Sequence, residues 1–95
     1  MDFVSRLLPI GAGRAIGGGM TSSELTNLIL SRLVRLEGGT RQRWRRALGE
    51  MRIYSIATHP HCNWDVRPAG SSAEHAAIER MLDWAREAHP QVSAD

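Results

Sequence analysis

Apolar and polar positions follow a helical period over residues 21–38. The apolar positions recur at spacings of three and four, and are Leu25, Leu28, Ile29, Leu33 and Leu36. The opposite stripe is polar and consists of Glu24, Asn27, Ser31 and Arg35. Thr21 or Ser22 is a suitable N-cap and Gly38 a suitable terminator. The pattern therefore predicts an amphipathic helix between these ends.

Leu30 and Val34 widen the apolar face of this helix beyond what one small core usually needs. Two explanations are open. The surplus apolar surface forms a homodimer contact through the helix carrying Leu25, Leu28, Ile29 and Leu33, or it is buried inside the monomer.

Residues 40–49, TRQRWRRALG, fit two patterns. As a helix, the segment has Thr40 as cap, Gly49 as terminator, and Trp44, Ala47 and Leu48 on one face. As a strand, it alternates arginines with other residues, and the chain would then run helix–strand–strand–strand–helix. The cap and stop signals favour a short basic helix.

Residues 51–58, MRIYSIAT, are rich in strand-forming side chains and predict a strand. Residues 63–68, NWDVRP, predict its antiparallel partner, which Pro68 ends. The period of two places Trp64 and Val66 on one face, with Asn63, Asp65 and Arg67 on the other. The segment HPHC between the strands has the length of a hairpin connection.

The final helix is predicted from Ser71 to Pro90. Ser71 and Glu74 have the spacing of a capping box, and Pro90 stops the helix. Its apolar face consists of Ala77, Ile78, Met81, Leu82 and Ala85. Glu79, Asp83 and Glu87 repeat every four residues on the solvent side.

These elements predict a small single α+β domain: two N-terminal helices, the second short and basic, a two-stranded antiparallel hairpin, and a long C-terminal helix. A two-stranded ribbon is marginal alone, so it must pack against the first and last helices, with Trp64 and Trp84 in the core. We expect the domain to span residues 20–90 and residues 91–95 to form a tail. Residues 1–19 form a flexible glycine-rich extension in this interpretation, and Met20 is a candidate for the true translation start.

The composition is that of a folded protein, with 42% hydrophobic and 23% charged residues. A single cysteine, Cys62, excludes an intramolecular disulfide, and no apolar run is long enough for a membrane span. We therefore expect a cytoplasmic protein. The net charge of +2 conceals a gradient, since residues 40–52 carry +4 and residues 71–95 carry −3.

All twelve basic residues are arginine, and four of them surround Trp44 in RQRWRR. Arg41, Arg43, Arg45 and Arg46 are the candidate binding residues. We expect a small intracellular interaction or regulatory protein, without enzymatic activity, that presents these arginines to an acidic protein partner. The alternative is a nucleic-acid-binding module that uses the same arginines. Trp44 could stack on an unpaired base in the strand interpretation, whereas in the helical interpretation it faces inward.

The segment THPHCNWDV, residues 58–66, supplies the other candidate chemistry. If His59 and His61 are both extended, their imidazoles project to one side, as in an H-x-H zinc pair, with Cys62 as a further ligand and Asp65 or His75 as the fourth. Structural zinc sites usually use paired cysteines, so a structural turn is the favoured interpretation and no cofactor is expected. Cys62 as a nucleophile is weaker still, because neighbours in an extended segment point apart.

Overall fold

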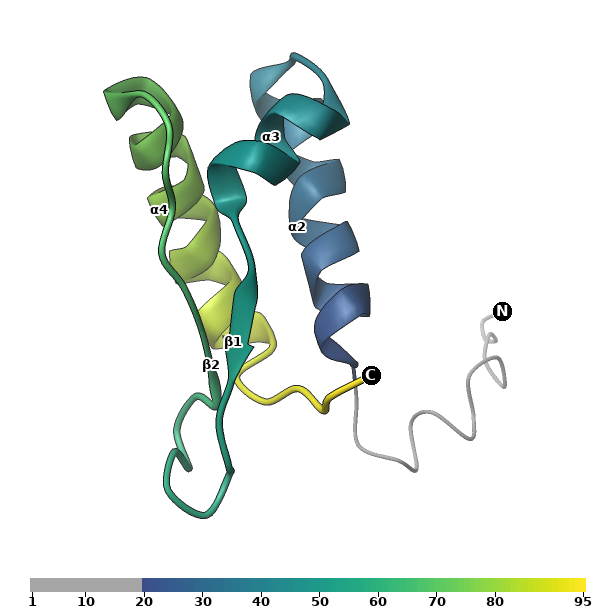
Figure 1. The fold of residues 1–95 in the computed structure, drawn as a ribbon, viewed down its shortest axis with the longest axis vertical. Helices are drawn as coiled ribbons and strands as arrows, with labels where there is room; N and C mark the ends of the chain where they lie inside the picture. Colours follow the sequence, from purple (N-terminus) through teal and green to yellow (C-terminus); the bar gives the residue numbers. More distant parts are fainter. Residues whose placement is uncertain (1–19) are drawn as a thin grey trace, which may run out of the picture.

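In the computed structural model, which describes residues 20–95, helices and a hairpin follow one another in the predicted order. The elements are α2 (Ser22–Glu37), α3 (Arg41–Leu48), β1 (Met51–Ile53), β2 (Trp64–Val66) and α4 (Ser72–Ala88). The long helices α2 and α4 run in opposite directions, and α3 lies across one end of the pair (Figure 1). The predicted α+β class is confirmed. The predicted extension 1–19 lies outside the described residues.

The caps act at the predicted positions. Thr21 caps α2 in a capping box with Glu24, and Gly38 closes the helix. Ser71 and Glu74 form the same arrangement at the start of α4. Capping side chains satisfy backbone N–H groups that the first helical turn leaves unpaired, so these ends are determined locally.

The hairpin is shorter than the sequence predicts. β1 and β2 pair antiparallel, with Met51 opposite Val66 and Ile53 opposite Trp64. The prediction that residues 51–58 form one strand is wrong beyond Ile53, because the backbone N–H groups of Thr58 and His59 both bond to the carbonyl of Ser55 and turn the chain. The loop that follows β1 extends away from the helices (Figure 1).

The helices and the hairpin enclose one apolar core. The buried apolar residues are Leu25, Ile29, Leu30, Leu33, Trp44, Ala47, Leu48, Trp64, Val66, Ala77, Ile78, Met81, Leu82, Ala85 and Val92. Trp64 is buried as predicted, and its Nε1 donates to the carbonyl of His89 at 2.8 Å. Trp84 is only partly buried, and the guanidinium of Arg32 lies 3.9 Å from its ring centroid.

The wide apolar face of α2 is used inside the monomer. Leu25, Ile29 and Leu33 are 0% exposed, and Leu28 packs against the core. Burial inside the monomer thus accounts for Leu25, Ile29 and Leu33, and the structure gives no support to the suggested homodimer contact through this helix. Leu36, at 62% exposed, is the one residue of the predicted apolar face that faces solvent.

Residues 91–95, which the sequence suggested to be a tail, pack against the rest of the domain. Val92 is buried, and Thr21 pairs with Ser93 in an isolated parallel bridge. Asn63, predicted to face away from the core, is the buried polar residue that holds this segment. Its Nδ2 donates to the carbonyls of Tyr54 and Val92, and its Oδ1 accepts from the Val92 N–H at 2.8 Å. The domain thus extends through the last residues of the chain.

Candidate functional site

The basic segment 41–48 is a helix, so its strand alternative is wrong. The Thr40 hydroxyl accepts from the Arg43 N–H at 3.1 Å, and Gly49 ends the helix with a φ of 76° that favours glycine. Trp44, Ala47 and Leu48 are buried on one face. The four candidate arginines, Arg41, Arg43, Arg45 and Arg46, are all exposed.

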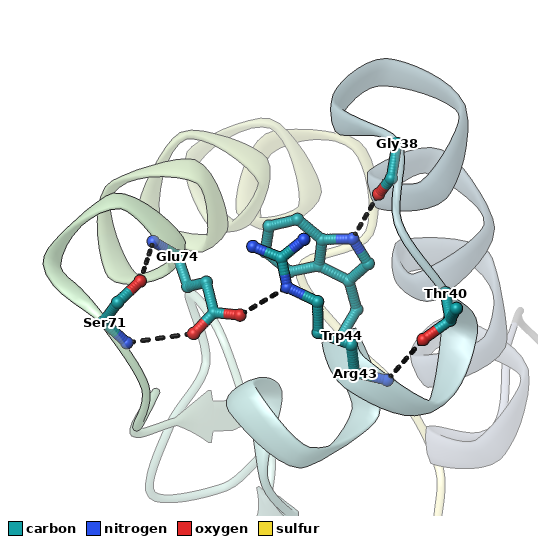
Figure 2. Close-up of polar contacts among 6 residues, drawn as sticks. All are labelled: Gly38, Thr40, Arg43, Trp44, Ser71 and Glu74. Carbon is teal, nitrogen blue, oxygen red and sulfur yellow. Dashed lines mark hydrogen bonds and ion pairs between the residues drawn. The ribbon is translucent and has the colours of Figure 1, made fainter.

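Trp44 is a core residue. Its side chain is 2% exposed, and its indole Nε1 donates to the carbonyl of Gly38 at 2.7 Å (Figure 2). This bond ties the start of α3 to the end of α2. A ring buried in this way presents no face on which a base could stack.

Arg43 is tied to the acidic helix. Its Nε donates to Glu74 Oε2 at 2.6 Å, and the same carboxylate accepts from the Ser71 N–H at 2.9 Å (Figure 2). The hydrogen bond from the Ser71 backbone and then that from Arg43 lower the pKa of Glu74 below its ordinary value. The guanidinium of Arg43 also lies 5.0 Å from the ring centroid of Trp44.

Arg41 is tied to α2. Its two terminal nitrogens donate to Ser31 Oγ, at 3.5 Å, and to Asn27 Oδ1. Both acceptors belong to the polar stripe predicted for that helix. Arg41 and Arg43 therefore hold α3 between its two neighbours.

Arg45 and Arg46 have no side-chain hydrogen bond or ion pair within residues 20–95. Both line an open groove of about 850 Å³ between α3 and the first half of α2. The other lining residues are Ser22, Ser23, Thr26, Asn27, Gln42, Gly49, Glu50 and Met51. Arg46 also borders a smaller cavity of about 310 Å³, beside Arg43 and Glu74.

The groove between α2 and α3 is not predicted by the sequence pattern. The exposed polar positions on α2 were visible as a stripe, but the pattern does not show which element lies opposite them. The crossing of α2 and α3, where Arg41 meets Asn27, brings the two polar surfaces together.

At one end of the groove, the Asp95 carboxylate lies against the first turn of α2. It accepts from Ser22 Oγ at 3.0 Å, from the Ser23 N–H at 3.1 Å and from Ser23 Oγ. These bonds, above all the one from the Ser23 hydroxyl, lower the pKa of Asp95 below its ordinary value. A negative charge is stabilised at this position by the free N–H groups of the helix end.

The segment carrying His59, His61 and Cys62 forms the loop between the strands. His59 stacks on Tyr54, with ring centroids 4.4 Å apart, and the Cys62 thiol donates to the carbonyl of Trp64 at 3.4 Å. His61 is exposed. Within residues 20–95, no group of three or more histidine, cysteine, aspartate or glutamate side chains is placed to hold a metal ion. The suggested zinc constellation is thus not assembled in the described fold.

Comparison with known proteins finds no matching family model, no matching curated protein and no matching solved structure. Among the described helices, none combines the length and the apolar character needed to cross a membrane.

Proposed function

We propose that this chain is an intracellular, non-enzymatic interaction protein whose basic segment, Arg41–Arg46 on α3, binds an acidic segment of a partner protein. The observation that carries the proposal is the state of Arg45 and Arg46. Both are exposed, both line one groove, and neither has a side-chain partner within residues 20–95. Arginine offers planar, two-pronged contacts that match a carboxylate.

A non-catalytic role is favoured by the position of Cys62, because cysteine is the most nucleophilic kind of side chain in this sequence and Cys62 is its one example. The thiol is half-buried and donates to a backbone carbonyl, whereas a catalytic cysteine needs a neighbouring base and an orienting group. Of the two histidines of the loop, His61 is exposed. His59 is engaged with Thr58 and Tyr54.

Nucleic-acid binding through the same arginines is the second candidate, because exposed guanidinium groups also bind phosphates. Two observations make it less favoured. The buried Trp44 removes the stacking platform, and Glu50 lies in the groove lining with Arg45 and Arg46 and would repel a continuous polyanion.

The experiment is affinity capture from a native-host extract with the full chain as bait, with and without nuclease treatment. The control bait replaces Arg41, Arg43, Arg45 and Arg46 by glutamine. Exposed ion pairs contribute about 0.5 kcal/mol each, so four of them correspond to about a thirtyfold change in affinity. Specific partners that persist after nuclease treatment and disappear with the control bait are the expected result. A control bait that retains every partner would exclude the basic segment as the binding surface.

Capture that depends on intact nucleic acid would instead select the second candidate. A melting temperature for the control bait close to that of the wild type is required, so that lost binding is not lost folding.

A further inference from the structure

The four candidate arginines divide into two pairs with different surroundings. Arg41 and Arg43 donate to Asn27, Ser31 and Glu74, so their guanidinium groups are used within the fold. Arg45 and Arg46 follow on the same helix, are exposed, and make no such contact within residues 20–95. The first pair connects α3 to its neighbours, and the second pair is available to a ligand.

We propose that the groove between α2 and α3 is a peptide-binding site, in which carboxylates of an acidic peptide segment pair with Arg45 and Arg46 while Arg41 and Arg43 only position the helix. This rests on the proposed function and narrows it to one pair of residues, one surface and one class of ligand. Charge complementarity is the reason for an acidic ligand, since Arg45 and Arg46, unpaired within residues 20–95, line the groove. Of its two carboxylates, Glu50 lies in the lining, and Asp95 at one end already bonds to Ser22 and Ser23.

The remaining lining residues suit a peptide. Asn27 uses its Oδ1 to accept from Arg41 and retains its amide N–H groups, and the exposed Gln42 offers both a donor and an acceptor. Such neutral groups match the alternating N–H and C=O groups of a peptide backbone. The partly buried Met51 adds a flexible apolar contact, which favours an apolar side chain beside the acidic ones.

The same features disfavour a nucleic acid in this groove. Two phosphate contacts on a single strand correspond to a salt slope of only about −1.4 in log–log form, far below that of proteins that bind through many phosphates. Glu50 stands inside the groove, where a continuous phosphate backbone would meet it. A peptide can instead place a neutral residue opposite Glu50.

The test uses a fluorescein-labelled peptide of about ten residues that alternates glutamate with leucine, and fluorescence polarisation at low salt. The full chain is compared with two matched double variants, Arg45→Gln/Arg46→Gln and Arg41→Gln/Arg43→Gln. Both remove two positive charges from the same helix. We expect the first to weaken binding about fivefold and the second to change it less than about twofold, because only the first removes groups that contact the ligand.

Two further ligands test whether the affinity depends on the carboxylates of the peptide and whether phosphates bind better. A peptide with glutamine in place of glutamate should bind at least about fivefold more weakly. A single-stranded oligonucleotide of similar length should not bind more tightly than the acidic peptide, and tighter, competing binding by the oligonucleotide would overturn the proposal in favour of nucleic acid.

Equal losses in the two double variants would also overturn it, and would show that the segment acts through summed charge. That result leaves the wider proposal intact, because the four-arginine control bait tests the wider proposal independently. If a variant does not fold, amide chemical shifts of the wild-type chain during peptide titration decide instead. Changes centred on residues 22–27 and 42–51 are expected, and changes confined to other surfaces would contradict the site.

Discussion

The Nε of Arg43 donates to Glu74 Oε2 at 2.6 Å, and this contact joins the basic helix α3 to the first turn of the acidic helix α4. Glu74 already closes the capping box of α4 with Ser71, so one carboxylate serves both a local cap and a long-range ion pair. Part of the positive charge of residues 40–52 is therefore neutralised by a carboxylate of residues 71–95 of the same chain. It withdraws Arg43 from the surface available to a ligand and leaves Arg45 and Arg46.

Stability should fall as the solution is acidified, and part of that fall should belong to Glu74. Its pKa is lowered from an ordinary value of 4.5, first by the Ser71 backbone and then by Arg43. A carboxyl group with a lowered folded-state pKa contributes stability that is complete above its unfolded-state pKa and is lost as pH falls through the folded-state pKa. Urea midpoints measured from about pH 7 to about pH 3 should drop less steeply for Glu74→Gln than for the wild type.

Glu87 supplies the matched control for this experiment. It lies on the same helix and makes no side-chain hydrogen bond or ion pair within residues 20–95. Glu87→Gln should leave the acid limb of the curve unchanged. A Glu74→Gln curve that follows the wild type at every pH would show that the charge of Glu74 contributes nothing to folding.

The two tryptophans predicted to be core residues should differ in importance. Trp64 is 2% exposed and donates to the carbonyl of His89, so Trp64→Ala should lower the free energy of unfolding by about 3–5 kcal/mol. Trp84 is only partly buried and is covered by Arg32, so Trp84→Ala should cost clearly less. Chemical denaturation of both variants measures the difference, and an equal or larger loss for Trp84→Ala would contradict the described core.

Asn63 should be a strong determinant of stability despite being polar. Asn63→Ala leaves the carbonyls of Tyr54 and Val92 and the N–H of Val92 without their side-chain partner in a buried setting. Each such group costs about 1–3 kcal/mol, so a loss of at least about 2 kcal/mol is expected. The amide of Val92 should also exchange with solvent much faster.

Asn27→Ala is the control for that experiment, because Asn27 is exposed and its Oδ1 bonds only to Arg41. Its effect should stay within about 0.5 kcal/mol. If Asn63→Ala were equally mild and Val92 exchange unchanged, residues 91–95 would not be held by the contacts described above.

Metal removal should leave the fold unchanged. His59 stacks on Tyr54, the Cys62 thiol bonds to the backbone, and no set of three ligands converges within residues 20–95. We expect less than stoichiometric zinc by elemental analysis and the same melting temperature with and without a chelator. A chelator that melts the domain would restore the zinc interpretation of the loop and would require a different arrangement of His61.

The elements that sequence reasoning located correctly are those with local signals. Thr21 with Glu24, Ser71 with Glu74, and Thr40 with Gly49 mark helix ends because a cap satisfies N–H groups only a few residues away. The inward orientation of Trp44 follows from its spacing with Ala47 and Leu48. Pairing of β1 with β2 was also predictable, although the turn at Ser55 shortened the first strand.

The candidate site could be predicted only in part. Four neighbouring arginines were visible as a group, but their separate roles depend on Asn27, Ser31 and Glu74, which lie ten to 31 residues away along the chain. The same applies to Leu25, Ile29 and Leu33, whose apolar character predicted burial without showing whether α4 or a second copy would cover them. The period of apolar residues shows which face of a helix is apolar. It does not show which element, or which second molecule, packs against that face.

The sequence by itself determined where the helices begin and end, which of their faces are apolar, and that the positive charge gathers at residues 40–52, because each of these depends on neighbours within a turn or two. Only the tertiary structure decided that Asn63 holds residues 91–95 in the domain and that Arg45 and Arg46 line a groove with α2. Those outcomes depend on how separate elements cross. The contacts join residues that lie far apart along the chain, and a pattern of neighbouring residues does not show which distant residues will meet.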